Sequence, residues 1–165
     1  MGSRTPFRKP RLAVTLGDPA GIGPEVILKA LVRSDLRRLA EFAIVGDARV
    51  LERTRLRLGI RVDWLPWTIG LPLFGRKIRL FHSPTSMRVA PKPGRSSRET
   101  GRVSLACVEA GIDLCLRGEA DGLVTGPICK AAWQAAGCPF PGHTELLAAR
   151  TGAKTVVMML VGGWL

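Results

Sequence analysis

Short apolar segments typical of buried strands alternate along this chain with amphipathic segments typical of helices, and glycine or proline separates most of them. This alternation favours an α/β domain with a largely parallel sheet, because a parallel strand must be followed by a crossover that covers one face of the sheet. We expect strands at 12–16, 42–45, 60–65, 77–81, 121–125 and 155–160. We expect helices at 25–33, at 48–58, between Ser96 and Gly118, at 128–136 and at 144–150.

Two features sharpen this expectation at particular places. Ser96 and Glu99 have the spacing of a capping box, and Val103, Cys107, Ala110 and Leu114 form an apolar stripe on the helix that follows. Thr144 can cap the helix that ends near residue 150. Residues 66–75 and 83–97 are rich in proline and glycine, so they are expected to be loops.

The composition restricts the class of protein. A chain of 165 residues with 46% hydrophobic and 23% charged residues suits one globular domain and is incompatible with global disorder. No stretch is apolar enough for a transmembrane helix, and the run at 12–16 is too short for a signal-peptide core. We therefore expect a cytoplasmic protein without a membrane partner.

Positive charge is concentrated in the first part of the chain. The net charge is +12, and 21 of the 25 Lys and Arg residues lie within residues 1–102. Such an excess raises the question of a nucleic-acid partner. The absence of a compact basic run interleaved with aromatic residues argues against one and favours a basic, solvated surface.

Metal and thiol chemistry find little support in the residues. The four cysteines at 107, 115, 129 and 138 form no C-x-x-C pair, so we expect reduced structural thiols. There are only two histidines, His82 and His143, and no H-x-x-H motif, so no metal ligands are assigned within this chain. His82 is expected to be structural or exposed. No G-x-S-x-G or other nucleophile signature occurs, and no catalytic residue is assigned.

The first candidate site is the glycine-rich turn GDPAGIGPE at 17–25, which joins an expected strand to an expected helix. Free N–H groups at a helix start attract anions, and glycine lets a ligand approach the backbone, so Asp18, Gly21 and Gly23 are cleft candidates. The motif is no Rossmann fingerprint, because Val26 stands where the third glycine would be. A simple tight connection, with Pro24 starting the helix, is the alternative.

Two more candidates follow later strands or turns. In TGPICK, at the carboxyl end of the strand expected at 121–125, Thr125 and Lys130 are positioned for an anionic ligand. In PGHTE, His143 stands on a turn before a helix, where it can donate, accept or titrate near neutral pH, and Thr144 adds a hydroxyl. The alternatives are a solvated lysine and a capped helix with a solvated histidine.

Five segments in one order resemble the 4-hydroxythreonine-4-phosphate dehydrogenase family of vitamin B6 biosynthesis. They are VTLGDPAGIGPEVILKAL, ETGRVSLACVEAGIDL, GLVTGPICKAAWQAAG, FPGHTELLA and TVVMML, which together span about residues 11–161. The resemblance implies an α/β, isocitrate/isopropylmalate-dehydrogenase-like three-layer fold and a homodimer. It also implies oxidation of a phosphorylated hydroxy acid with NAD or NADP, followed by decarboxylation, with a divalent metal (Zn, Mg or Co) bound.

The resemblance assigns roles to individual residues. His143 and Thr144 match the family's substrate-binding His-Thr pair, and the cleft candidates Asp18, Gly21, Gly23, Thr125 and Lys130 match segments near its active site. The family's metal ligands follow the segment matching TVVMML, so residues 1–165 are expected to be the N-terminal portion of a truncated fold whose C-terminal half is absent. Two other functions stay open: a dehydrogenase of 4-phospho-D-threonate or erythronate, and a non-catalytic phosphate-binding remnant.

The strand expected at 155–160 also suggests that further polypeptide covers the sheet. A buried strand at 155–160 would need cover on both faces, yet only five residues follow it. Either a partner supplies that cover or the chain is the front part of a longer protein.

Overall fold

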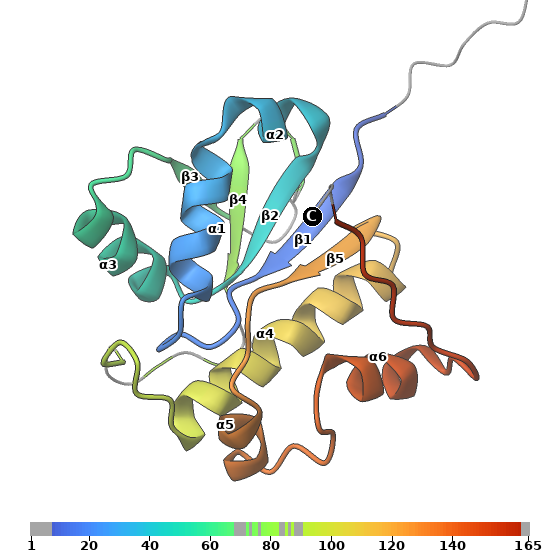
Figure 1. The fold of residues 1–165 in the computed structure, drawn as a ribbon. Coiled ribbons are helices and arrows are strands. Elements are labelled where there is room, and N and C mark those ends of the chain that lie inside the picture. The colour runs from blue at the N-terminus through green and yellow to red at the C-terminus, as the bar shows by residue number, and fades with distance from the viewer. Residues whose placement is uncertain are drawn as a thin grey trace, which may run out of the picture.

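Five parallel strands form the sheet of this protein in a computed structural model, which describes residues 8–67, 72, 74–75, 77–82, 85, 87 and 91–162. The strand order is β3-β4-β2-β1-β5. The first strand, β1, therefore lies between β2, the next strand along the chain, and β5, the last (Figure 1). All four strand pairings are parallel. The strands are β1 (Arg11–Thr15), β2 (Glu41–Gly46), β3 (Trp64–Pro66), β4 (Ile78–His82) and β5 (Gly122–Thr125).

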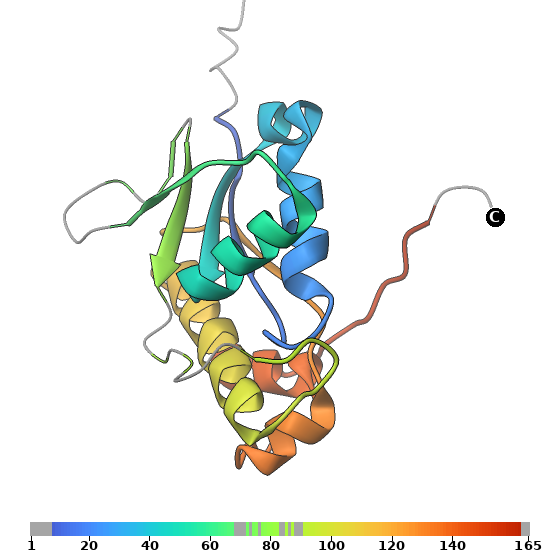
Figure 2. The same cartoon turned by 90° about the vertical axis from the view of Figure 1, so that its left-hand side faces the viewer.

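Helices cover both faces of this sheet, which confirms the expected α/β class with its helix–sheet–helix layering. The helices are α1 (Gly23–Val32), α2 (Ser34–Leu39), α3 (Ala48–Leu58), α4 (Arg98–Leu116), α5 (Lys130–Ala135) and α6 (His143–Thr151). In Figure 2, α1 and α3 lie on one side of the strands and α4 on the other. Helices α5 and α6 pack against α4. The described part of the chain contains no helix that is both long and apolar enough to cross a membrane.

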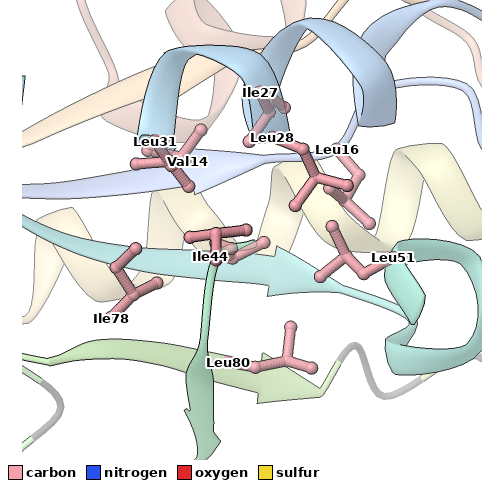
Figure 3. Close-up of a cluster of buried hydrophobic side chains, with 10 residues drawn as sticks. Val14, Leu16, Ile27, Leu28, Leu31, Ile44, Leu51, Ile78 and Leu80 are labelled. Carbon is pink, nitrogen blue, oxygen red and sulfur yellow. The ribbon is translucent and has the colours of Figure 1, made fainter. Parts of the chain in front are cut away.

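Successive side chains of β1 point to opposite faces of the sheet, so neighbouring residues pack in two separate cores. Ala13 belongs to the cluster under α4, whereas Val14 belongs to the cluster under α1 and α3. In that second cluster, Leu28 and Leu51 point from their helices onto Ile44 of β2 (Figure 3). All three are fully buried, and burial of such a side chain stabilises the fold by about 1.5–3 kcal/mol.

The expected helix stripe on α4 is confirmed, but two caps differ from the prediction. Ser97, not Ser96, precedes α4: its N–H donates to Thr100 Oγ1 (2.9 Å), and the Thr100 N–H donates back to Ser97 Oγ (3.3 Å). A threonine thus takes the place expected for Glu99. Gly142 precedes α6 and Thr144 lies inside it, so Thr144 is not the cap.

Other boundaries moved by a few residues. The alternating segment expected at 60–65 pairs only at Trp64–Pro66, and the helix expected from 128 begins at Lys130. Helix α2 was not expected; it has six residues, none of them buried, and a segment this short gives little hydrophobic periodicity to detect. His82 is exposed, as expected. Parts of the loops expected at 66–75 and 83–97 lie outside the described residues.

The strand expected at 155–160 is wrong. These residues form no strand, and the exposed fraction of their apolar side chains from Val156 to Leu160 runs from 45% to 92%. Figure 2 shows the segment leaving α6 and running away from the sheet. An apolar, β-branched sequence becomes a strand only where a neighbouring strand accepts its backbone hydrogen bonds, and within residues 8–162 none of the described strands lies beside it.

Asp47 connects α3 to a distant segment. It is almost fully buried, its Oδ1 accepts from the N–H of Arg49 (2.9 Å), and its Oδ2 accepts from the N–H of Met87 (3.0 Å). The Arg49 guanidinium pairs with the same carboxylate and also donates to the Met87 carbonyl. Burial alone would raise the Asp47 pKa, but these hydrogen bonds outweigh burial and hold the pKa below its usual range.

Asp47→Ala should therefore lower the free energy of unfolding at pH 7 by about 2 kcal/mol, since a helix cap and a buried hydrogen bond are both lost. Because the folded pKa is depressed, this contribution is fully present above the unfolded pKa of about 4 and disappears as pH falls through the folded value. Urea unfolding between pH 7 and 3 measures the difference. The control is Asp35→Ala, which removes an exposed carboxylate paired with Arg33 and should cost about 0–1 kcal/mol. Equal losses at pH 7 and pH 3 would contradict the prediction.

Candidate functional site

Two of the sequence candidates meet at the carboxyl edge of the sheet. The glycine-rich turn follows β1, the TGPICK segment follows β5, and these strands are neighbours. The N–H of Asp18 donates to the Pro127 carbonyl (2.9 Å), and the N–H of Gly126 donates to the Thr15 carbonyl (2.8 Å). The two turns are therefore joined directly by backbone hydrogen bonds.

Close packing explains two of the glycines in the first turn. A Cβ added at Gly17 would lie 2.3 Å from the Pro127 carbonyl oxygen, and Gly17 also has a positive φ of 73°. A Cβ at Gly23 would lie 2.1 Å from the Leu16 carbonyl oxygen. Gly21 differs, because it is exposed and an added Cβ would approach nothing closer than 3.3 Å. Of the three, Gly21 thus presents its backbone to solvent at the surface of the turn.

Asp18 is the buried polar group of this turn. Its side chain is 2% exposed, and its Oδ1 accepts from the N–H of Ala20 (2.8 Å). Its Oδ2 is buried and has no hydrogen-bond partner among the residues that the structure describes, and the same holds for the hydroxyl of Thr15 at the end of β1. A buried carboxylate oxygen without a donor is costly, so this position suits a ligand or water that supplies one.

His143 occupies the first position of α6 and packs against a tryptophan. Its ring centre lies 5.3 Å from that of Trp133, in an edge-to-face arrangement with 76° between the ring planes. His143 Nε2 is buried, and no residue in the described part of the chain forms a hydrogen bond with it. Burial lowers the pKa of His143 below its usual value, so the neutral imidazole predominates at neutral pH.

Trp133 and Ser104 are supporting residues that the sequence analysis missed. Trp133 is fully buried, and its Nε1–H donates to Ser104 Oγ (3.1 Å) on α4. The available signal was a serine on the buried face of the α4 stripe, since a buried hydroxyl needs a partner. This pair positions the ring on which His143 rests.

Lys130 lies beside the turn that carries His143. A Cβ built on Gly142 would be 3.4 Å from Lys130 Cε and 4.0 Å from its Nζ. The same position is 3.6 Å from Glu145 Oε2. The exposed Lys130 therefore approaches Gly142, the residue that directly precedes His143 and Thr144 at the start of α6.

The candidate site consequently has two parts connected by residues 126–130. Asp18 and the exposed Gly21 belong to the part at the end of β1, and Lys130, His143 and Thr144 belong to the part at the start of α6. Thr125 is paired with Thr15 at the end of the β1–β5 register and is partly buried. In the part of the chain that the structure describes, no hydrogen bond links Asp18 to His143.

These residues do not by themselves complete a metal or dinucleotide site. Within the described ranges, no group of three His, Cys, Asp or Glu side chains is arranged to hold a metal ion. The orphaned His143 Nε2 offers a single imidazole nitrogen, fewer donors than a metal centre needs. In the glycine-rich turn, Gly23 is required by packing against Leu16, and the third glycine of a dinucleotide fingerprint is missing.

The parallel sheet, the helices on both faces and the polar turns at its carboxyl edge define an α/β protein with the isocitrate/isopropylmalate-dehydrogenase-like fold. The model of the family described as "Pyridoxal phosphate biosynthetic protein PdxA" matches residues 38–165. The chain belongs to this family, as the sequence resemblance predicted.

Individual relatives agree with this membership. The chain is 42% identical over 151 residues to the 4-hydroxythreonine-4-phosphate dehydrogenase of Thermosynechococcus vestitus, covering 92% of this chain and 42% of the relative. It is 41% identical over 163 residues to the D-threonate 4-phosphate dehydrogenase of Bordetella bronchiseptica, covering 96% of this chain and 46% of the relative. The crystal structure of a 4-hydroxythreonine-4-phosphate dehydrogenase from Burkholderia phymatum superposes with a TM-score of 0.85 at 28% identity, covering 94% of this chain and 48% of that one. The chain thus spans somewhat less than half the length of the relatives it matches.

Proposed function

We propose that this chain supplies the part of an NAD(P)-dependent dehydrogenase that binds the phosphorylated hydroxy acid, with 4-phosphooxy-L-threonine as the substrate. The observation that carries the proposal is the position of Lys130 beside Gly142, which directly precedes His143 and Thr144, together with a buried His143 Nε2 that has no hydrogen-bond partner among the described residues. Family membership and the names of the relatives support the same substrate class. Residues 1–165 are proposed to be the N-terminal portion of the full enzyme, which would act as a cytoplasmic homodimer.

The residues of this chain would bind and orient the substrate. The Lys130 ammonium would attract the phosphate or the carboxylate of the substrate. The neutral His143 imidazole would donate a hydrogen bond to a phosphate oxygen, or donate to or accept from a hydroxyl. Because Trp133 packs against the His143 ring, that ring has little freedom to rotate before substrate arrives. The nicotinamide cofactor and the divalent metal would need binding residues from outside this segment, since the described residues do not fit either group.

The proposal is tested by isothermal titration calorimetry, in which 4-phosphooxy-L-threonine is added to the full chain. Lys130→Met should weaken binding about 10-fold or more, because a hydrogen bond to a charged group contributes roughly 1.5–3 kcal/mol. His143→Asn should weaken it similarly. Lys154→Met is the matched control, since Lys154 is exposed in the segment after α6 and should bind as the unmodified chain does.

The outcomes separate the alternatives. Failure of the unmodified chain to bind at millimolar ligand, or equal losses in Lys154→Met and Lys130→Met, would refute the proposed site. Tighter binding of 4-phospho-D-threonate would favour the second candidate substrate, which the 41% identity to the Bordetella relative supports. Binding with no NAD(P)⁺ reduction, even when the remaining half of a relative is supplied, would indicate a phosphate-binding remnant.

A further inference from the structure

A trough of basic and aromatic side chains lies at the amino edge of the sheet, where β2, β3 and β4 begin. It consists of two adjoining cavities of about 540 and 590 Å³, which share Arg37 of α2 and Ile78 of β4 as walls. We propose that the larger cavity is a second ligand site, which binds a nucleoside phosphate. This site is separate from the proposed substrate site and does not rest on it.

The trough and the candidate substrate site lie at opposite ends of the same sheet. All strand pairings are parallel, so the residues that precede β2, β3 and β4 meet at one edge and those that follow β1 and β5 meet at the other. Figure 1 shows α2 beside the starts of β2 and β4, and α5 beyond the opposite end of the strands. Strands of this length span roughly 17–20 Å, so a ligand in the trough would touch neither Lys130 nor His143.

Basic side chains dominate the walls of the larger cavity. The three cations that line it are Arg37, Arg61 and Lys77, and Asp63 is the one carboxylate among its described walls. All three cations are exposed, and none of them forms an ion pair with a described residue. Asp63 also interacts electrostatically with Arg55 of α3. The cavity therefore has positive charge available for an anion, and the substrate site uses none of these cations.

Trp64 gives the same cavity an aromatic wall. It begins β3, where it is paired with Ile78 of β4, so the residues directly before these two lie side by side at the edge of the sheet. The indole packs against the core under α1 and α3 but is only partly buried, which leaves part of it accessible from the cavity. Aromatic side chains bind nucleobases by stacking. An indole beside three cations is thus suited to a base and its phosphates together.

The shape and charge of the trough favour a small ligand over a nucleic acid. Cavities that bind small molecules commonly have volumes of about 300–1,000 Å³, and the larger cavity, at about 590 Å³, lies in that range. Glu41 lines the adjoining cavity, and together with Asp63 it would repel a phosphate backbone that ran along the whole trough. A single nucleotide can instead turn its phosphates toward the cations.

Isothermal titration calorimetry of the full chain with ADP tests this proposal, with adenosine and pyrophosphate as separate probes. ADP should bind with a Kd of about 1 mM or tighter, and the other two, which each lack one recognised group, should bind about 10-fold more weakly. Arg61→Met and Lys77→Met should each weaken ADP binding about 10-fold, because each removes a charged hydrogen-bond donor. Arg95→Met is the matched control, since Arg95 is exposed and follows Gly94, whose N–H donates to Ala20 at the opposite edge of the sheet. It should bind ADP as the unmodified chain does.

Two further measurements locate the ligand and identify its contact with the ring. Amide chemical shifts should change at 61–65 and 77–78 when ADP binds, and those of the glycine-rich turn at 17–25 should stay unchanged. Trp64→Leu keeps an apolar wall but removes the indole, so it should weaken ADP binding about 10-fold. The same variant should bind pyrophosphate as the unmodified chain does, which a misfolded variant would not.

Four results would overturn the proposal. They are no ADP binding at about 5 mM, equal affinities for pyrophosphate and ADP, shift changes centred on 17–25, and equal losses of ADP binding in Arg95→Met and Arg61→Met. Tighter binding of a short single-stranded DNA than of ADP would also overturn it, because a nucleic acid would then be the occupant of the trough.

Discussion

Replacing Gly17 with alanine should lower the free energy of unfolding by about 2–4 kcal/mol. Two costs combine: a positive φ of 73° is strained for alanine by roughly 1 kcal/mol, and a Cβ only 2.3 Å from the Pro127 carbonyl oxygen must push the two turns apart, which costs about 1–3 kcal/mol more. The Asp18–Pro127 backbone hydrogen bond would be lost with that movement. Urea unfolding followed by circular dichroism measures the loss.

Gly59→Ala is the matched control for this prediction. Gly59 ends α3 with a φ of 63°, yet an added Cβ meets nothing within 4 Å, so this variant carries the backbone strain alone. It should cost about 1 kcal/mol. If both variants lost the same stability, the steric contact between the two turns would not be what requires glycine at position 17.

Trp133→Ala should be the most destabilising substitution near the candidate site, at about 4 kcal/mol. The side chain is fully buried in the cluster formed by α4, α5 and α6, and removing a buried tryptophan leaves a large cavity. The hydroxyl of Ser104 would also lose the donor that it accepts from. Chemical denaturation with two probes would measure the effect and check that unfolding stays two-state.

A conservative variant and the pKa of His143 distinguish this effect from a general loss of packing. Trp133→Phe keeps the ring against His143 but removes the indole N–H, so it should cost only about 1–2 kcal/mol. Burial lowers the His143 pKa, so opening the site in Trp133→Ala should raise it toward the ordinary value near 6.5, whereas Trp133→Phe should leave it depressed. NMR titration of the imidazole protons measures both. An unchanged His143 pKa in Trp133→Ala would contradict the role assigned to this packing.

The local signals in the sequence succeeded where one periodicity dominated. The helix at 48–58 was predicted with the bounds that the structure shows. The apolar stripe predicted for α4 is also confirmed, because Val103, Cys107 and Leu114 are all buried. The prediction of Ser96 as the cap of α4 was wrong because two neighbouring serines compete for that position. Ser97 with Thr100 and Ser96 with Glu99 both satisfy the spacing, and only the path of the chain into the helix selects between them.

The candidate site could be predicted as three motifs but not as an arrangement. Nothing local to Lys130 indicates that its ammonium lies beside Gly142, or that Pro127 accepts a hydrogen bond from Asp18. These contacts arise because β5 pairs with β1 across more than a hundred residues, which brings their carboxyl ends to the same edge. The supporting role of Trp133 has the same origin.

The sequence by itself determined the α/β class, the order of most strands and helices, and membership of the family, because hydrophobic periodicity and short motifs are local properties of the chain. Tertiary structure alone decided which glycines are required by packing, which side chains surround His143, and whether an apolar segment is a strand. Residues 155–160 have the composition of a buried strand and are nevertheless exposed. A strand and a buried face are relations between two segments, so their formation depends on a partner that composition cannot supply.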